Sequence, residues 1–324
     1  MVICGAIVSA NANTAAAGLI NQYDVITIGN VTTQNDIEGP SLIGGNASLA
    51  TVGLNGGSQL GVNLVNVLGN LNGSSLNINN GGNLAIGGKV NTNVNYNGGG
   101  HLVNLTTNQV STLSSAIQEI KTDSSGFAQM YSADSGFAKN TLDLSQSSNP
   151  TFHINYVDSK GNAIVSVSAS TLTANSNANF GLTFGVPQSS ISSLVIDVTG
   201  GPSVTIPGNE HFDGFANNSY LNSHLIWNFT DATSLSVGAN LHGAILAPNA
   251  DVSTSVSLDG AVWANSLQAG GEIHYPLYAG NLPSLGSTSS SDSAAVPEPS
   301  TLVMGSIAAV LLAGYSIRRR RQRR

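Results

Sequence analysis

Short apolar runs alternate with turns rich in Gly and Asn from residue 37 to residue 97. Three of these runs are variants of one phrase: Leu42-Ile43-Gly44-Gly45-Asn46, Val67-Leu68-Gly69-Asn70-Leu71 and Ala85-Ile86-Gly87-Gly88-Lys89-Val90. Leu68 and Ile86 are eighteen residues apart, and Leu241-His242-Gly243-Ala244-Ile245 recurs seventeen residues later as Leu258-Asp259-Gly260-Ala261-Val262. This period and these short strands are typical of the coils of a parallel β-helix. We therefore predict a mainly β fold, a parallel β-helix (solenoid), with Asn side chains forming ladders at its turns.

Between the two repeat regions the apolar period changes to three or four residues, which predicts an amphipathic α-helix. The positions on its apolar face are Val110, Leu113, Ile117 and Ile120, with Ala116 on the same side. Thr107 or Asn108 would cap its start, and Gly126 would end it. We expect this helix to pack along the flank of the β-helix. A membrane or partner role is the alternative, but the polar face carries little charge.

Other segments alternate like strands. Residues 23–31 are expected to form one strand with a Gly-Asn break, and residues 151–168 a β-hairpin that turns at residues 158–162. Further strands are predicted at 180–186, 193–199, 204–207 and 225–229.

The C-terminal apolar run, residues 301–317, holds no charge, and six of the ten Lys and Arg of the chain follow it. As a helix rising about 1.5 Å per residue, it would just cross roughly 25 Å of hydrocarbon. We predict a transmembrane helix whose Arg cluster stays cytoplasmic. Residues 284–295 are rich in Ser and predict a flexible spacer before it.

The same tail resembles a PEP-CTERM sorting signal. The residues that carry the resemblance are Val296, Pro297, Glu298 and Pro299 before the apolar run, and Arg318, Arg319, Arg320 and Arg321 after it. The resemblance implies recognition by an exosortase, a membrane cysteine transpeptidase that cuts near the Pro-Glu-Pro box. Membrane residence would then be temporary. An ordinary tail anchor is the alternative.

The N-terminus predicts a secretory signal peptide over residues 1–12, with Ala10 and Ala12 at the small-x-small cleavage site. It lacks a basic n-region, which suggests a truncated start. The one cysteine, Cys4, lies in this leader, so the mature protein would use neither disulfides nor thiol chemistry.

The segment before Val296 is acidic, with sixteen Asp and Glu against four Lys and no Arg. This charge argues against nucleic acid as a partner. A hydrophobic content of 41% is normal for a chain with a packed core, although charged residues make up only 8%.

A longer series of phrases resembles the choice-of-anchor A family, also described as an ice-binding-like adhesive domain. The phrases span residues 18–283 and include Trp227-Asn228-Phe229, Leu246-Ala247-Pro248-Asn249-Ala250 and Glu272-Ile273-His274-Tyr275-Pro276. The resemblance implies a β-helix interrupted by a long helix lying along it, and an adhesive or matrix role. Members carry interchangeable C-terminal sorting signals.

β-Helix folds also host polysaccharide lyases and hydrolases, whose sites need clustered carboxylates or a basic residue beside a metal. The densest acidic cluster holds Glu210, His211 and Asp213, which could bind a hard cation if they converge. Asp36 and Glu38 are a similar candidate pair. A solvated loop is the commoner outcome for such clusters. We expect no cofactor and no catalytic residue.

Two further ligands were weighed. Trp227 and Trp263 could stack on sugar rings, but both lie in apolar strand phrases and are expected in the core. Ice binding would need a regular ladder of Thr on one coil face, whereas Thr is scattered in this sequence.

The sequence as a whole predicts an exported, non-enzymatic protein of the cell surface or the exopolysaccharide matrix, adhesive in function. Its expected partners are the secretion machinery, an exosortase, the inner membrane before processing, and exopolysaccharide or another glycan. A β-helix enzyme acting on polysaccharide is the main alternative, and an ice-binding protein the minor one.

Overall fold

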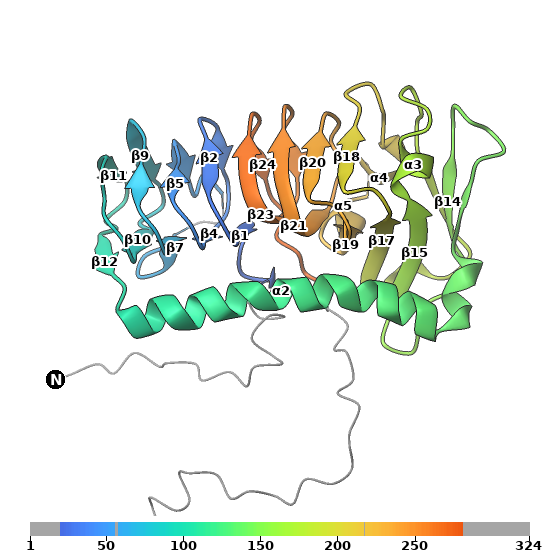
Figure 1. Cartoon of the computed structure of the whole chain (residues 1–324), viewed down its shortest axis with the longest axis horizontal. Helices are drawn as coiled ribbons and strands as arrows, with labels where there is room; N and C mark the ends of the chain where they lie inside the picture. The colour runs from blue at the N-terminus through green and yellow to red at the C-terminus, as the bar shows by residue number, and fades with distance from the viewer. Residues whose placement is uncertain (1–19, 56–57, 217, 281–324) are drawn as a thin grey trace, which may run out of the picture. The chain divides into compact units, whose positions relative to one another are not determined.

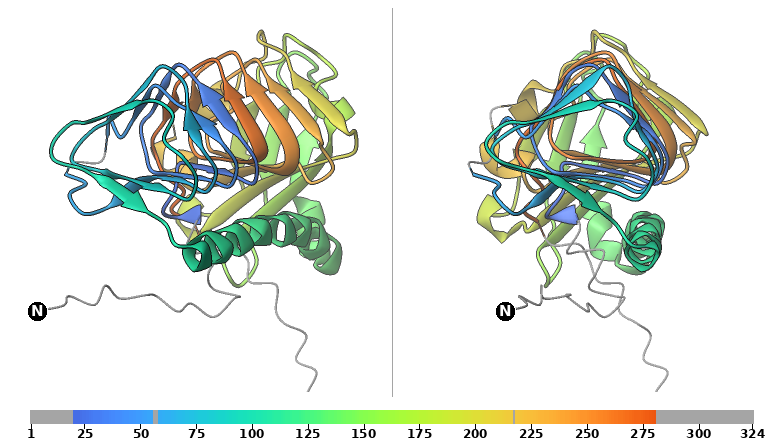
Figure 2. Two further views of the ribbon diagram at one scale, coloured as in Figure 1. Left: turned by 60° about the vertical axis from the view of Figure 1, so that its left-hand side comes forward. Right: turned by 90° about the vertical axis from the view of Figure 1, so that its left-hand side faces the viewer.

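Residues 20–55, 58–216 and 218–280 are described by a computed structural model, and they form a solenoid of parallel strands with one long helix beside it (Figure 1). Each complete coil contributes a strand to each of three faces, which an end-on view shows as a roughly triangular outline (Figure 2). The predicted mainly β fold of parallel sheets with one long helix is confirmed.

Face 1 holds ten strands in a single hydrogen-bonded path. In spatial order they are β12 (Leu102–Asn104), β10 (Asn83–Ile86), β7 (Asn63–Val67), β4 (Ser41–Ile43), β1 (Val25–Thr27), β23 (Val262–Ala269), β21 (Ala244–Thr254), β19 (Leu225–Asn228), β17 (Ser193–Thr199) and β15 (Asn162–Ser168). Its strands read as nearly continuous apolar runs because both sides of this face are buried.

Face 2 continues the same sheet around a corner. It contains β18 (Ser203–Ile206), β20 (Ser234–Val237), the C-terminal parts of β21 and β23, β2 (Val31–Thr33), β5 (Ala47–Ser48) and β8 (Leu71–Asn72). Face 3 is a separate sheet in the order β11 (Asn93–Tyr96), β9 (Ser75–Ile78), β6 (Thr51–Val52), β3 (Asp36–Ile37), β24 (Ile273–His274) and β22 (Leu258–Asp259).

The third sheet, sheet C, belongs to the end of the molecule opposite β12. It contains β13 (Thr141–Asp143), β14 (Thr151–Ile154) and β16 (Gly181–Phe184). Short helices lie in the long connections of this region: η1 (Ser135–Lys139), α3 (Ala169–Leu172), η2 (Gln188–Ser190), α4 (Asp213–Ala216) and α5 (Ser219–Asn222).

The coils do not stack in sequence order. The N-terminal half, residues 20–105, builds outward from β1 to β12, and the C-terminal half, residues 134–280, builds inward from β15 to β23. The two halves join at a seam where β1 and β2 pair with β23, and β3 pairs with β24, all parallel. The first strand of the chain therefore lies in the middle of the stack.

Helix α2 (Thr107–Ala133) connects the two halves and runs along face 1 (Figure 1). Its 27 residues span about 40 Å, close to the roughly 43 Å needed to pass ten strands spaced by about 4.8 Å. The helix thus carries the chain from one end of the stack to the other, so that the second half can build back toward the first.

The predicted bounds of this helix were wrong at both ends. Thr106 caps it, in a capping box with Gln109, in place of Thr107 or Asn108. The helix also continues through Gly126 to Ala133. The reason is that its apolar stripe continues: Phe127 is buried, and Met130 and Tyr131 pack on the same cluster as Ile117 and Ile120.

The repeated Gly-Asn phrases stack in register, as predicted. The backbone N–H of Asn46 donates to Asn30 Oδ1, that of Asn70 to Asn46 Oδ1, and that of Lys89 to Asn70 Oδ1, each at 2.8 Å. Gly fits beside these Asn residues because the coils approach closely: a Cβ on Gly45 would lie 2.6 Å from the Gly29 carbonyl carbon. Strand partners in this half differ by 16 to 24 residues, for example Leu84 and Leu102.

Two apolar clusters form the core. One fills the inside of the coils, and the other lies between face 1 and α2. Trp227 is fully buried in the first cluster and Trp263 in the second, so both tryptophans occupy the core positions expected for them.

Two strand predictions were wrong. Residues 151–168 do not form a hairpin, because β14 pairs with β13 and β16 while β15 pairs with β17. Residues 23–31 are divided between two strands, because the chain turns a corner at the Gly-Asn break. In the part of the chain that the structure describes, no helix is long and apolar enough to cross a membrane. The predicted spacer and transmembrane helix, at 284–295 and 301–317, lie outside that part.

Candidate functional site

Face 2 presents a straight row of polar side chains to solvent. Along each of its strands apolar and polar residues alternate, so that residues such as Leu235 and Val252 point into the core while Ser236 and Ser253 point outward. Strand pairing then places the outward residues next to one another from coil to coil. We name the result the polar row; it consists of Thr205, Ser236, Ser253, Gln268, Thr32, Ser48, Asn72 and Asn91.

The polar row has a regular spacing. Its eight positions occupy successive coils and span about 34 Å at the usual distance between strands. The row crosses the seam between Gln268 and Thr32. At its far end Asn91 Nδ2 donates to Asn72 Oδ1 at 2.9 Å. Hydroxyl and amide groups in this arrangement can hydrogen-bond a long ligand that carries many hydroxyl groups or ordered water.

Face 3 carries a row of alternating imidazole and carboxylate groups. His242 Nδ1 lies 2.9 Å from Asp259 Oδ2, and His274 Nδ1 lies 3.1 Å from Glu38 Oε1. His274 Nε2 is 3.4 Å from Glu272. The contact between His274 and Glu38 crosses the seam, and the backbone N–H of Tyr275 reinforces it by donating to Glu38 Oε2 at 2.8 Å.

The pKa values of these carboxyl groups follow from their neighbours. Burial acts to raise the pKa of Glu38, but hydrogen bonds from Tyr275, Asn55 and His274 outweigh it and hold the pKa below its usual value. The hydrogen bond from His242 lowers the pKa of Asp259 in the same way. Buried Asp24 behaves oppositely: desolvation raises its pKa well above the usual value, although Gly39 N–H donates to its Oδ2.

The pairing of Asp36 and Glu38 with a metal is not what the structure displays. Glu38 is engaged with His274 and Tyr275, while Asp36 lies on the adjoining strand opposite Thr51. Over the described ranges, no group of three or more His, Cys, Asp or Glu is arranged to hold a metal ion.

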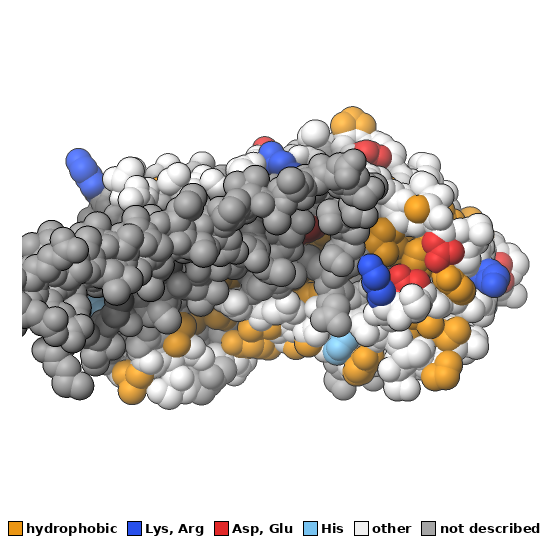
Figure 3. All heavy atoms as spheres, turned by 90° about the horizontal axis from the view of Figure 1, so that it is seen from below, with side chains coloured by type: hydrophobic (Ala, Val, Ile, Leu, Met, Phe, Trp, Pro, Cys, Tyr) orange, Lys and Arg blue, Asp and Glu red, His pale blue; other side chains and the backbone are white. Residues whose placement is uncertain are grey.

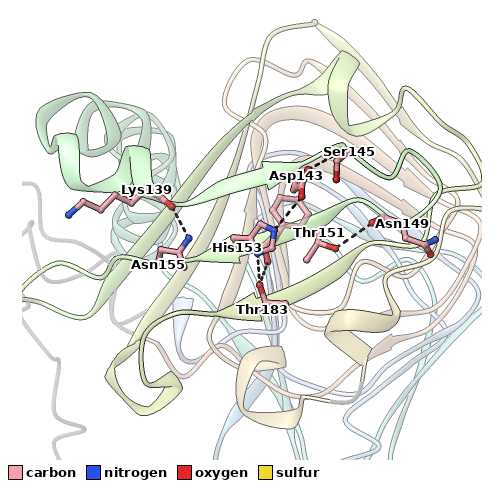
Figure 4. Close-up of polar contacts among 9 residues, drawn as sticks. Lys139, Asp143, Ser145, Asn149, Thr151, His153, Asn155 and Thr183 are labelled. Atoms are coloured by element: carbon pink, nitrogen blue, oxygen red, sulfur yellow. Dashed lines mark hydrogen bonds and ion pairs between the residues drawn. The ribbon is translucent and has the colours of Figure 1, made fainter.

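The outer surface of sheet C has a third polar cluster, shown in Figure 4. His153 Nδ1 lies 2.6 Å from Thr183 Oγ1, and His153 Nε2 lies 3.8 Å from Asp143 Oδ2. The order carboxylate, imidazole, hydroxyl is that of a nucleophilic triad. However, 3.8 Å is too long for a hydrogen bond, so the carboxylate does not orient the ring as such a triad requires. A hydrogen bond from Ser145 N–H to Asp143 contributes most to lowering the pKa of this carboxyl group.

The predicted cluster of Glu210, His211 and Asp213 does not converge. Glu210 is buried, with neither carboxylate oxygen hydrogen-bonded, whereas His211 and Asp213 are exposed. Asp213 Oδ2 accepts a hydrogen bond from Asn179. Desolvation raises the pKa of Glu210 to about 7. The buried carboxyl group is a pH-sensitive part of the fold and shares no site with its two neighbours.

The polar row and the His-carboxylate row were not found from the sequence. Their members lie up to 237 positions apart, as for Glu38 and Tyr275, and their alignment depends on how the coils stack. The predicted leader residues Ala10 and Ala12 and the predicted sorting-signal residues lie outside the described residues.

Comparison with known families decides the affiliation. The model of the "Ice-binding-like adhesive domain" matches residues 16–275, which is most of the chain. The chain belongs to this family. The model of the PEP-CTERM protein-sorting motif matches residues 295–321. Both resemblances expected from the sequence are thereby confirmed.

Other comparisons with this ice-binding-like adhesive protein are less informative. No curated protein matches it significantly. Among solved structures it is similar to the crystal structure of an ice binding protein from an Antarctic biological consortium. The identity is 17% and the TM-score 0.25, over 86% of this chain and 97% of that chain. The two family matches together imply an exported, cell-surface protein that is processed through its PEP-CTERM motif.

Proposed function

We propose that this protein is a non-enzymatic adhesive protein of the cell surface or the exopolysaccharide matrix, and that it binds glycan chains along face 2. The observation that carries the proposal is the polar row, eight outward polar positions in register on successive coils. Most are fully exposed, and seven of the eight are uncharged hydroxyl or amide groups that follow each other without a break; the eighth, Gln268, is also an amide. An extended glycan offers hydroxyl groups along its whole length, so each coil can add a weak contact.

Weak contacts repeated along one chain add up when the surface is rigid. The outward groups of the polar row are held by strands whose inward partners, such as Val204 and Leu267, are buried in the core. Little conformational entropy is therefore lost on binding, which is the usual condition for tight recognition by a preformed surface.

The test is a glycan-array screen of the purified ectodomain with two matched variants. Ser253→Arg places a long charged side chain in the middle of the polar row, and we expect binding at least ten times weaker. Ser115→Arg makes the same change on the exposed surface of helix α2 and should leave binding unchanged. Equal affinities of the two variants would remove face 2 from the proposal.

Two parallel assays separate the other functions. Release of reducing ends from a bound polysaccharide would show an enzyme and overturn the non-enzymatic part of the proposal. Thermal hysteresis that Ser253→Arg abolishes would show that face 2 binds ice. The regular spacing of the polar row favours this second candidate, although only Thr205 and Thr32 supply threonine.

We also propose that the tail crosses the inner membrane through residues 301–317, with the Arg cluster in the cytoplasm, until an exosortase cuts near Pro297-Glu298-Pro299. Changing these three residues to Ala should keep the unprocessed chain in the membrane fraction. The measurement is an immunoblot of membrane and secreted fractions, and unchanged processing would contradict the proposal. The match of the PEP-CTERM model to residues 295–321 supports it.

A further inference from the structure

The coil that contains β10, β11 and β12 leaves the interior of the solenoid open at one end. In the coil before it, the inward side chains Leu71, Leu76 and Ile78 are completely buried. The residues stacked on them in the last coil, Val90, Val94 and Tyr96, are only partly buried. On face 1, Leu102 continues the column above buried Leu84 and is 42% exposed. Every interior column thus ends in an apolar side chain that solvent reaches.

No other element of the described residues covers this end. In the end-on view the last coil faces the reader, and α2 passes beside it without crossing it (Figure 2). Leu60 and Val62, from the loop before β7, add apolar surface and are 65% and 45% exposed. We name the surface formed by β11, β12, Leu60 and Val62 the open end. Exposed apolar surface of this kind marks an interaction site.

The open end also has free backbone hydrogen-bonding groups. Leu84 N–H donates to His101 O, and Leu105 N–H donates to Ile86 O. Because groups alternate along a parallel strand, the N–H and C=O groups of Leu102 and Asn104 point away from β10. Such an edge strand pairs readily with another strand.

The Asn ladders end here too. Asn95 Nδ2 donates to Asn77 Oδ1 at 2.9 Å, and Asn97 Nδ2 donates to Asn79 Oδ1 at 2.8 Å. Within the described residues, Asn95 and Asn97 are the last members of these ladders, and their own Oδ1 atoms receive no hydrogen bond from a further coil. The open end therefore offers donors on its edge strand and acceptors on both its strand and its side chains.

The charge distribution indicates which partner fits. The whole chain has a formal charge of −7, so two copies repel one another over most of their surface. Between Gly39 and Gln118, however, Lys89 is the only Asp, Glu, Lys or Arg. The open end is made from this segment and is the place where two copies can approach without repulsion.

The opposite end of the stack is closed and charged. Asn140 Nδ2 donates to Ile164 O of β15, the last strand of face 1, at 3.1 Å. Asp134, Lys139 and Asp143 lie in the adjoining η1 and sheet C region. Figure 3 shows a group of acidic and basic side chains at this end. An open end cannot dock there as it can on another open end, so head-to-tail growth into a filament is disfavoured.

We propose that the protein forms a closed dimer through its open end, with the β12 strands of two copies pairing antiparallel across a two-fold axis. The exposed Leu102 and Tyr96 of each copy are covered in the dimer, and the free N–H and C=O groups of Leu102 and Asn104 are satisfied. The polar rows of two copies then belong to one particle, which can hold two glycan segments or two stretches of one chain.

The test measures the mass of the full-length chain in mild detergent by size-exclusion chromatography with light scattering. We expect twice the mass of one chain for the unchanged protein. Leu102→Lys puts two like charges on the two-fold interface and should give the mass of one chain. The control is Leu144→Lys, which changes a leucine that is 49% exposed beside sheet C and should leave the dimer intact. Circular dichroism and the thermal transition check that both variants fold.

The outcomes are decisive in each direction. Loss of the dimer in Leu102→Lys alone supports the proposal. A monomeric unchanged protein at about 100 μM would overturn it, as would a dimer that persists in Leu102→Lys, which would place the contact in the C-terminal tail. A mass that rises without limit with concentration would show a filament instead, and a mass that fits a different bound protein would show that another partner covers the open end.

Discussion

The two halves of the solenoid share one coil geometry but are stabilised by different contacts. In the N-terminal half, neighbouring coils repeat after 16 to 24 residues, and Asn side chains link one coil to the next. In the C-terminal half, β15, β17 and β19 repeat after 31 residues, because short helices lengthen the connections. Large coils enclose a wider interior, and aromatic side chains fill it.

The aromatic filling is confined to the C-terminal half. Phe152, Phe180, Phe212, Phe215 and Trp227 form one cluster, with ring centroids 4.9 to 6.3 Å apart. The interior of the N-terminal half uses Val, Leu and Ile instead. A narrow coil is thus held by backbone and amide hydrogen bonds and by small apolar residues, and a wide coil by a few large rings. Substitutions in each half should therefore differ in size and in kind.

The largest effect is expected from Trp227→Ala in the wide coils. The indole is fully buried against three Phe rings, and its Nε1 donates to the carbonyl oxygens of Leu241 and His242. Its removal should lower the free energy of unfolding by about 3–5 kcal/mol, measured by denaturant titration. Trp227→Phe keeps a ring in the cluster and should cost less. An equal loss for both variants would mean that the hydrogen bonds, and not the packing, stabilise this half.

A pH-dependent effect is expected from Glu210, in the same half. Its pKa is raised in the fold from 4.5 to about 7, so the folded state holds this proton more tightly than the unfolded state. The stability it contributes is complete below about pH 4.5 and is lost as pH rises through 7. Glu210→Gln stays neutral, so it should gain at most about 3 kcal/mol over the unchanged protein at pH 8 and little at pH 4.

Thermal unfolding between pH 4 and pH 8 measures this difference. Asp213→Asn, three residues away and exposed, is the control and should follow the pH profile of the unchanged protein. A Glu210→Gln profile that also falls between pH 4.5 and pH 7 would contradict the assignment.

The smallest effect is expected from the Asn ladder of the narrow coils. Asn70 Oδ1 accepts the N–H of Lys89, and Asn70→Ala removes this acceptor at a cost of about 1 kcal/mol, because water can replace it at this half-exposed position. Asn70→Asp keeps the acceptor and should recover most of the loss in a denaturant titration. If Asp costs as much as Ala, the ladder contributes through the shape of the amide rather than through this hydrogen bond.

The same comparison explains what could be predicted from the sequence. The narrow coils carry their turn chemistry at fixed intervals, so Gly44-Gly45-Asn46 and Leu68-Gly69-Asn70 predicted both the coils and the Asn contacts between them. The wide coils have a 31-residue interval interrupted by short helices, and no repeat was visible. Residues 151–168 looked like a hairpin because local alternation does not reveal which strands become neighbours.

The candidate sites escaped prediction for a related reason. The polar row and the pair of Glu38 and His274 depend on the seam between the halves, and nothing local in either segment indicates that they meet. The cluster of Glu210, His211 and Asp213 was visible as sequence neighbours, but alternation along an extended segment turned one side chain inward and the others outward.

The seam also sets the order in which the molecule can be completed during synthesis. Strand β1 is among the first to leave the ribosome, yet its partner β23 begins at Val262, after nearly the whole domain has been made. Until then β1 is an unpaired edge, and closing it requires contacts of very high sequence separation, a feature of slowly folding proteins. A chain stopped just before residue 262 would contain every coil of the N-terminal half and most of the C-terminal half, but its two halves would be connected only through α2.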